Sequence, residues 1–462
     1  MMPTRSRSTA AIARPLRAAS PARMAQSPAS IAARKLVERR LLSPGASYQM
    51  SHQHRQSFHS TPGQSSAIAA AISVASKTVS NAMKTAAGIS NLPIDPLRLV
   101  SKEMRSLTGN IRKLLGTGHP SLDRVAKYYT QSQGKHMRPM IVLLMARAVA
   151  LCPKSDVTPS NHDIDANITP REVLIEGLSD SPLTSFLPDT PAQVDDDILP
   201  SQRRLAEITE LLHTASLLHD DVIDESQSRR GEPSANLAFG NKMAVLAGDF
   251  LLGRASVALA RLRNAEVIEL LSTVIANLVE GEFMQLKNTA QDEKTPVWSE
   301  EAVTYYLQKT YLKTASLISM SCRATALLGG ASPETVESAY LYGKNLGLAF
   351  QLVDDLLDYT QSHEELGKPA GADLELGLAT APLLFAWKTN PELGTLVGRK
   401  FSKEGDVALA RKLVLESDGI EQTRALAQSY HDKAVAALTE FPDSDAKDGL
   451  ISTAAKVLKR KH

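Results

Sequence analysis

The chain has 462 residues, of which 43% are hydrophobic and 22% charged, a composition that is ordinary for a soluble globular protein. Its formal net charge of +2 excludes the global basic field that nucleic-acid binding would favour, so we expect no nucleic-acid partner. No continuous run of about 18 apolar residues predicts a membrane-spanning helix, and any contact with a membrane would be peripheral.

The first 60 residues form an acid-poor leader that is rich in Arg, Ser and Ala. They contain ten Arg and Lys residues against one acid, Glu38. This composition is typical of a mitochondrial targeting segment, and a basic tail with another purpose is the alternative. The run Arg55-Gln-Ser-Phe58 also resembles the region near fungal presequence cleavage sites. We therefore expect a protein of the mitochondrial matrix, with at most peripheral contact with the inner membrane, and interpret the small and polar residues 61–95 as a linker.

Helical patterns dominate from Pro96 onward. Apolar residues return every three or four positions, as on one face of an amphipathic helix, in Lys135–Ala150, Arg203–His219, Lys242–Arg263, Glu266–Met284, Glu301–Leu328, Glu334–Tyr359 and Val407–Leu438. No alternating segment bounded by glycines predicts a sheet. Residues 96–462 are therefore predicted to form an all-α helix bundle with a large core. Cys152 and Cys322 lack the spacing of a zinc or redox motif and are expected to be buried thiols.

One segment interrupts the helical pattern, at about residues 153–200. It contains seven prolines and many acids, including the run Asp195–Asp197. Such a segment inside a compact bundle is predicted to be a surface insertion. The acidic run could hold a metal ion, but a solvated acidic loop is the better interpretation in this context.

Three aspartates, Asp220, Asp221 and Asp224, end one of the apolar helices. Asp220 and Asp224 are four residues apart and share one helix face, where their charges repel each other near the negative end of the helix dipole. Folding alone does not favour this arrangement. A divalent cation such as Mg²⁺, which prefers carboxylate oxygens, would relieve the repulsion.

The same spacing recurs at Asp354, Asp355 and Asp358, which close an apolar helix that starts near Tyr340. A single cluster of this kind could be a solvated helix end. Two copies on two apolar helices favour a shared site instead. If the helices face each other, six carboxylates surround one cavity, where several Mg²⁺ ions could bridge them to a diphosphate.

Further motifs surround the two clusters. In chain order they include Gly134-Lys-His-Met-Arg-Pro139, Arg229-Arg-Gly-Glu-Pro-Ser-Ala-Asn236, Gly281-Glu-Phe-Met-Gln285, Lys313-Thr314 and Gly367-Lys-Pro369. Over about residues 96–462 the chain resembles the trans-prenyl diphosphate synthases, in particular the long-chain members that make the side chain of ubiquinone. The resemblance implies an isoprenoid synthase-type helix bundle around a deep central cavity. It also implies about three Mg²⁺ ions as cofactor, with isopentenyl diphosphate and an allylic diphosphate as substrates.

The resemblance also implies roles for individual residues. The metal ligands would be Asp220, Asp221, Asp224, Asp354, Asp355 and Asp358. Isopentenyl diphosphate would be held by Lys135, Arg138, His213 and Arg230, and the allylic diphosphate by Arg229, Lys313, Thr314, Gln351 and Lys368, because Arg and Lys suit phosphate. The pair Lys309-Thr310 is the alternative to Lys313-Thr314. His136 stands where relatives commonly carry Arg, and we expect no special role for it.

The implied reaction starts with metal-assisted departure of the allylic diphosphate. The double bond of isopentenyl diphosphate then attacks the allylic cation, and a proton leaves to the released diphosphate. Ala215 and Ser216 lie one turn before the first cluster, where short-chain relatives place aromatic side chains that block elongation. Small residues there predict an open tunnel and a product of about C40–C50, and routine packing of small side chains is the alternative.

Three other functions compete with this interpretation. A catalytically silent subunit of a heteromeric synthase would usually lose aspartates or phosphate-binding bases, which this chain keeps. A synthase of short or medium products, such as a farnesyl or geranylgeranyl diphosphate synthase, is disfavoured by the small residues at 215 and 216. A terpene cyclase would not need the residues that hold isopentenyl diphosphate. By family resemblance we expect a homodimer or a hetero-oligomer.

Overall fold

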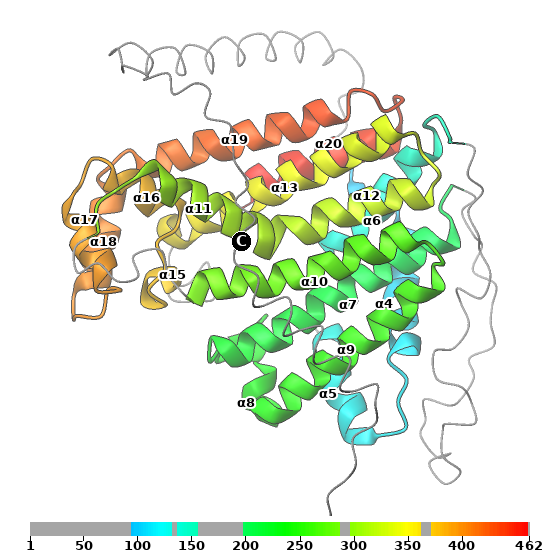
Figure 1. The fold of residues 1–462 in the computed structure, drawn as a ribbon, viewed down its shortest axis with the longest axis horizontal. Helices are drawn as coiled ribbons and strands as arrows, with labels where there is room; N and C mark the ends of the chain where they lie inside the picture. Colours follow the sequence, from blue (N-terminus) through cyan, green and yellow to red (C-terminus); the bar gives the residue numbers. More distant parts are fainter. Residues whose placement is uncertain (1–93, 132–135, 156–196, 287–295, 362–370, 461–462) are drawn as a thin grey trace, which may run out of the picture. The chain divides into compact units, whose positions relative to one another are not determined.

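Long helices dominate the fold (Figure 1). The computed structural model describes residues 94–131, 136–155, 197–286, 296–361 and 371–460, which all belong to the compact unit Asn91–His462. In chain order the elements are α3 (Pro96–Leu99), α4 (Ser101–Leu114), α5 (Pro120–Gln131), α6 (Met137–Ala150), α7 (Pro200–Ile223), β1 (Ser228–Arg229), β2 (Glu232–Pro233), α8 (Ala235–Phe239), α9 (Asn241–Arg261), α10 (Ala265–Leu286), α11 (Glu300–Thr310), the π-helix η2 (Tyr311–Ala315), α12 (Ser316–Leu328), α13 (Pro333–Thr360), α15 (Ala372–Glu375), α16 (Ala381–Trp387), α17 (Glu392–Gly398), α18 (Asp406–Leu415), α19 (Gly419–Ala437) and α20 (Asp445–Leu458). The all-α prediction is confirmed. The leader, nearly all of the linker and most of the insertion at 153–200 lie outside the described residues.

Two long helices, α7 and α13, carry the aspartate clusters at their C-terminal ends. Both begin with proline at the first helical position, where the missing N–H costs no hydrogen bond. Ser332 caps α13 by accepting a hydrogen bond from the backbone N–H of Thr335. Helix α7 packs against α6, α9 and α12, while α13 packs against α12 and α19. Cys152 and Cys322 are buried free thiols, as predicted.

Two predicted helical stretches differ from a single regular α-helix: one is divided and the other contains a π-helix. The stretch Val407–Leu438 is two helices, α18 and α19. Glu416, Ser417 and Asp418 separate them, and the start of α19 lies against α16, where a Cβ on Gly419 would come within 2.3 Å of the carbonyl oxygen of Pro382. The stretch Glu301–Leu328 is continuous but contains the π-helix η2 between α11 and α12. Such π-segments inside α-helices often mark functional sites.

Glycines let two neighbouring helices approach η2 closely. A Cβ on Gly347 of α13 would lie 2.6 Å from the Cα of Ala315, and one on Gly281 of α10 would lie 2.9 Å from the backbone nitrogen of Lys313. Both contacts are with backbone atoms, which cannot move aside as a side chain can. The segment that carries Lys313 and Thr314 is therefore held from two sides by α10 and α13.

Replacing Gly347 with Ala is expected to destabilise the protein by about 1–3 kcal/mol, because the methyl group overpacks a backbone contact. Gly253 of α9 is the matched control, since a Cβ there meets no atom within 4 Å. Ala at position 253 should stabilise the helix by about 1 kcal/mol, as helix propensity predicts. Thermal unfolding of both variants measures the difference, and equal effects would contradict the close approach.

Helix α9 is long and apolar enough to cross a membrane by length and composition alone. Of its most apolar window, 39% is buried inside the protein. Ala247, Leu251 and Ala255 lie on this buried face, and the helix packs against α7. A core helix meets the same criterion of length and composition, so this is weak evidence for a membrane span.

Candidate active site

The first cluster is built around Asp221, whose side chain is completely buried at the end of α7. The hydroxyl of Tyr129 on α5 donates a hydrogen bond to Asp221, and Arg229 donates two from its Nε (3.1 Å) and Nη2 atoms. Burial and the neighbouring Asp221 raise the pKa of Tyr129, so that its hydroxyl remains a donor. Asp221 therefore holds Arg229 and α5 in place, and its oxygens are already occupied by protein donors.

Asp220 and Asp224 keep more solvent contact than Asp221. Burial raises the pKa of Asp220 to about 6; Lys313 opposes this shift, while Glu282 and Asp224 add to it. The pKa of Asp224 is also raised, again mainly by burial. Both carboxylates are thus less stable as anions here than in water, and a bound cation would stabilise them.

A short hairpin places the two arginines that follow the first cluster. Strands β1 and β2 pair Arg229 with Glu232, and Arg230 and Gly231 form the turn between them. Both turn residues have positive φ, 57° for Arg230 and 81° for Gly231, as a tight two-residue hairpin turn requires. The turn separates the side chains, so that Arg229 reaches Asp221 while Arg230 is exposed. No strand was predicted in this segment.

The second cluster repeats the design of the first. Asp355 is buried and accepts hydrogen bonds from the hydroxyl of Tyr306 (2.6 Å), from Gln351 Nε2 (3.0 Å) and from the backbone N–H of Ala381 (3.4 Å). Burial raises the pKa of Asp355, and these donors lower it. In each cluster, the middle aspartate is thus fixed by a tyrosine from another helix.

The remaining aspartates of the second cluster differ from each other. Asp358 accepts hydrogen bonds from the backbone N–H groups of Ala372 (3.1 Å) and Asp373 (3.3 Å), at the start of α15. Asp354 accepts a hydrogen bond of 2.5 Å from Arg460 Nη1. Asp354 is 32% exposed at its side chain, whereas Asp355 is 2% exposed as a whole residue.

The π-helix η2 links the two clusters. The Lys313 ammonium donates to Glu282 and lies close enough to Asp220 and Asp224 to lower their pKa values. Thr314 donates to Gln351 Oε1 (2.8 Å), and Gln351 in turn donates to Asp355. The expected association of Lys313, Thr314 and Gln351 with the clusters is therefore seen.

Lys309, the alternative to Lys313, faces the second cluster instead. Its ammonium lies 5.5 Å from the centre of the Tyr306 ring, whose hydroxyl holds Asp355. Burial lowers the pKa of Lys309, while Asp355 and Asp373 raise it. One helix thus presents a lysine to each aspartate cluster.

A second group of cationic residues lies where α6 begins. Arg138 Nη1 lies 2.9 Å from His213 Nε2, and His136 Nδ1 lies 3.0 Å from Glu210 Oε1. Because guanidinium can only donate, His213 Nε2 accepts this hydrogen bond. Burial, followed by the charges of Arg138 and Arg230, lowers the pKa of His213 well below its ordinary value, so the imidazole is neutral.

Unsatisfied atoms within the described part of the chain indicate what the site could bind. Arg138 Nε is buried and donates to no described acceptor, a feature it shares with the Nε atoms of five other arginines, so the position of Arg138 beside His213, rather than this atom alone, favours an anion such as phosphate. Oε1 of Glu282 is buried without a described donor. No three Asp, Glu, His or Cys side chains in the described ranges lie close enough to hold a metal ion unaided. The carboxylate oxygens suit Mg²⁺, but a substrate would have to supply further oxygen ligands.

The product-length candidates lie on α7 within the described structure. Ala215 is completely buried, and Ser216 donates from its hydroxyl to the carbonyl oxygen of His213 (2.9 Å). Lys135 and Lys368 lie outside the described residues. Their expected roles beside Arg138 and the second cluster stay predictions.

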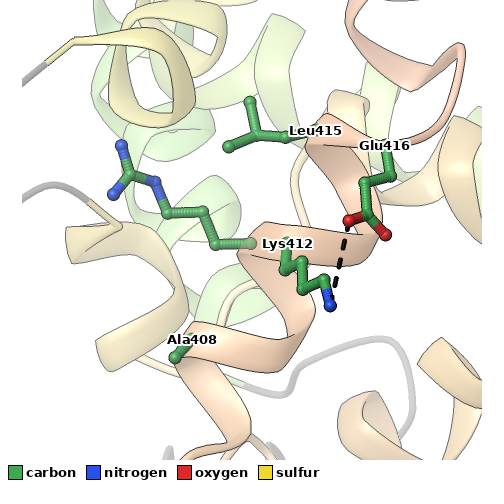
Figure 2. A pocket seen from close by; sticks show the side chains of 5 residues that line it. Ala408, Lys412, Leu415 and Glu416 are labelled. Atoms are coloured by element: carbon green, nitrogen blue, oxygen red, sulfur yellow. Dashed lines mark ion pairs between the residues drawn. The ribbon is translucent and has the colours of Figure 1, made fainter.

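A hollow of about 430 Å³ lies along one side of α18, far in the sequence from the first cluster. Its lining is shown in Figure 2 and comprises Ala408, Arg411, Lys412, Leu415 and Glu416. Lys412 and Glu416 form a solvent-exposed ion pair of 3.9 Å. None of these residues is an expected site residue, but Arg411 donates to the carbonyl oxygens of Tyr359 and Gln361, so the hollow adjoins the end of α13 that carries the second cluster.

Comparison with known proteins identifies the class. The family model "Polyprenyl synthetase" matches residues 119–414. The Neurospora crassa protein named "Probable hexaprenyl pyrophosphate synthase, mitochondrial" is 71% identical over 88% of this chain and 91% of its own length. "Decaprenyl-diphosphate synthase subunit 1" of Schizosaccharomyces pombe is 48% identical over 79% of this chain and 90% of its own length.

A solved structure agrees with these relatives. The crystal structure of a polyprenyl synthase from Caulobacter crescentus, complexed with calcium and isoprenyl diphosphate, matches with a TM-score of 0.64 and 31% identity, over 79% of this chain and 97% of that one. The chain belongs to the polyprenyl synthetase family. It is a trans-prenyltransferase, a polyprenyl diphosphate synthase, and its mitochondrial localisation agrees with the acid-poor leader.

Proposed function

We propose that the chain condenses isopentenyl diphosphate repeatedly onto an allylic diphosphate and so makes a long all-trans polyprenyl diphosphate for ubiquinone. The observation that supports this most is the paired design of the clusters. In each, a tyrosine fixes the buried middle aspartate, and a partly exposed carboxylate remains beside it, Asp220 in one and Asp354 in the other. Such fixed, partly desolvated carboxylates suit Mg²⁺ that is shared with a diphosphate.

The positions of the Arg and Lys side chains support a separate binding subsite for each of the two substrates. Arg138, with its buried and unsatisfied Nε, would hold isopentenyl diphosphate together with Arg230, Lys135 and the neutral His213. Lys313 and Thr314 would hold the allylic diphosphate, with Gln351, Lys368 and Arg229 around it. Arg229 already donates two hydrogen bonds to Asp221, so the cluster holds this arginine in position.

The metal ligands would be Asp220, Asp224 and Asp354, supported by Asp221, Asp355 and Asp358. When bound, Mg²⁺ would neutralise the charge of the departing diphosphate. The chain's own residues orient the two substrates and bring their reacting carbons together, which removes most of the entropic cost of the reaction. Lys313 adds a positive charge near Asp220 and Asp224, where the diphosphate would gain negative charge.

The proposal is tested with the purified chain, labelled isopentenyl diphosphate, an allylic starter and Mg²⁺. We expect labelled all-trans products that lengthen with time and disappear when EDTA removes the metal. The same assay without the allylic starter is the control. Absence of any condensation by the chain alone would favour the alternative of a non-catalytic subunit, and products that stop at C15 or C20 would favour a short-chain synthase.

Product length is the finer part of the proposal. The small residues Ala215 and Ser216 support a long product, expected at about C40–C50. The Neurospora crassa relative is named for a six-unit chain and the Schizosaccharomyces pombe relative for a ten-unit chain. A ten-unit product would be the upper end of the expected range, whereas a six-unit product would fall below it, and sizing of the products would decide between them.

Replacing Ala215 with Phe is expected to shorten the product by several C5 units, because the aromatic ring would block a tunnel along α7. Ala215 is completely buried, so Phe also overpacks the core at a cost of about 1–3 kcal/mol. Val at the same position is the graded control and should shorten the product less. Chromatography measures chain length, and unchanged length in a folded Phe variant would contradict the role of Ala215.

An exposed apolar face supports an oligomer. Three large side chains on α9 and three on α10 are exposed: Val245, Leu246, Val257, Val279, Phe283 and Leu286. The two helices contact each other, and grouped exposed apolar residues mark protein interfaces. A homodimer through this face is the proposal, and the name "subunit 1" of one relative keeps a hetero-oligomer as the alternative.

Replacing Phe283, which is 61% exposed, with Glu is expected to convert the oligomer to a monomer, because a charge in an apolar interface cannot be solvated. Light scattering coupled to size exclusion measures the mass. Leu415→Glu on α18, also at an exposed apolar side chain but on another helix, is the control. An unchanged mass of the Phe283→Glu variant would contradict the proposed interface.

A further inference from the structure

The last described residue of the chain, Arg460, reaches the second aspartate cluster. Helix α20 packs against α6 and α13, and the backbone N–H of Arg460 donates to the carbonyl oxygen of Val457 (3.3 Å) just beyond its end. The Arg460 guanidinium donates to Asp354 Oδ1 at 2.5 Å and lies 4.7 Å from the centre of the Phe350 ring. Phe350 and Asp354 are one helical turn apart, so α13 offers the guanidinium both an apolar platform and a carboxylate.

The position of Asp354 within the cluster makes this contact informative. Asp355 and Asp358 already accept hydrogen bonds from Tyr306, Gln351 and the backbone of α15. Asp354, by contrast, pairs with a full positive charge that comes from another part of the chain, Arg460. A carboxylate that a divalent cation could bind is thus neutralised by a monovalent group of the protein itself.

Arg460 also lies near the other substrate site. Burial lowers the pKa of Arg138, the charges of Glu210 and Asp354 raise it, and those of Arg230 and Arg460 lower it further. The Arg460 guanidinium therefore pairs with the second cluster and also interacts electrostatically with a cation proposed for isopentenyl diphosphate. Side-chain exposures of 29% for Arg460 and 32% for Asp354 leave the pair accessible to ions from solvent.

We propose that Arg460 is a stand-in for the metal: it neutralises Asp354 in the metal-free protein, and a divalent cation must displace it to bind there. The inference rests on the proposed function only in that Asp354 is taken as a metal ligand. The displacement lowers the affinity of the second cluster for metal, because the ion pair has to be broken first. The two clusters then differ in how metal binds to them, since the described contacts of Asp220 and Asp224 include no such arginine from the C-terminal end.

Binding of Mn²⁺ to the full chain without substrate tests this directly, with free Mn²⁺ measured by electron paramagnetic resonance. Breaking a partly exposed ion pair corresponds to a change of about three- to fivefold in affinity. We expect Arg460→Gln to bind Mn²⁺ at the second cluster about three- to fivefold more tightly than the wild type. Arg460→Lys, which keeps the charge, should stay near the wild type.

Two further variants make the test specific. In an Asp354→Asn background, the Arg460→Gln change should have no effect on Mn²⁺ affinity, because the carboxylate for which Arg460 and Mn²⁺ compete is gone. Lys456→Gln, which removes another cation of α20 that pairs with Asp95 at 3.0 Å, should leave the affinity unchanged. Thermal unfolding confirms that every variant is folded.

The result that overturns the inference is an unchanged or weaker Mn²⁺ affinity of Arg460→Gln, or the same gain in the Asp354→Asn background. Failure of every variant to bind Mn²⁺ overturns it as well. The condensation assay stands apart from these titrations. A chain that condenses substrates but shows no competition refutes only the role of Arg460, whereas competition without condensation refutes only the proposed function.

Discussion

Replacing Asp220 with Asn is expected to lower condensation activity by about 10³-fold or more, while the metal-free protein becomes more stable at pH 7. Activity falls because a neutral amide cannot hold Mg²⁺ as a carboxylate does. Stability rises because burial raises the pKa of Asp220 to about 6, so the folded protein carries an unfavourable anion at pH 7. Asn removes that anion, for a gain of about 3 kcal/mol.

The pH dependence of this gain distinguishes it from general effects of mutation. The folded protein binds the Asp220 proton more tightly than the unfolded chain does. Ionisation of Asp220 therefore lowers the free energy of unfolding of the wild type as pH rises from about 4 to about 7. The advantage of the Asn variant should therefore vanish as pH falls to about 4. Thermal unfolding in EDTA measures it, and Asp443→Asn, at a fully exposed carboxylate, is the control. If the Asn variant were less stable than the wild type at pH 7, the Asp220 anion would not be destabilising the metal-free protein.

Replacing Arg138 with Gln is expected to raise the KM for isopentenyl diphosphate about 100-fold and leave the KM for the allylic substrate nearly unchanged. The size reflects the loss of a half-buried cation that is proposed to bind phosphate. Steady-state kinetics with each substrate varied in turn measures both constants. The unequal response is the important readout, because a merely structural defect would reduce kcat without separating the substrates.

Thr314→Val provides the matched control for Arg138→Gln. It removes the hydroxyl that donates to Gln351 at 2.8 Å but keeps the side-chain volume. We expect the opposite pattern, with a higher KM for the allylic diphosphate and little change for isopentenyl diphosphate. If both variants affected the same substrate, the assignment of the two subsites would be wrong.

Much of the fold was predictable because its signals are local. Apolar residues at helical spacing predicted α7, α9, α10 and α13 to within a few residues at most of their ends. The break between α18 and α19 falls at Ser417-Asp418-Gly419, a turn-forming run that the apolar period passed over. The hairpin at Arg230 and Gly231 was missed because its strands are two residues long, too short for a period to appear.

The candidate site was predictable in its residue types but not in their arrangement. Equal spacing made the six aspartates look alike, whereas the structure separates the buried Asp221 and Asp355 from the partly exposed Asp220 and Asp354. That difference is due to Tyr129 and Tyr306, which lie far from the clusters in sequence and resemble ordinary core aromatics. Glu210 and Arg460 were missed for the same reason. Tertiary contacts alone join them to the site.

The π-helix η2 limits which changes of sequence this enzyme can accept during evolution. A π-turn accommodates one extra residue, so deleting one residue from 311–315 would restore a regular α-helix. Everything before the deletion would then rotate by about 100° relative to everything after it. Tyr306 and Lys309 would turn away from the second cluster while Ser316 and the rest of α12 stayed in register. A substitution in this helix changes one side chain, whereas a change in its length would dismantle the link between the clusters in a single step.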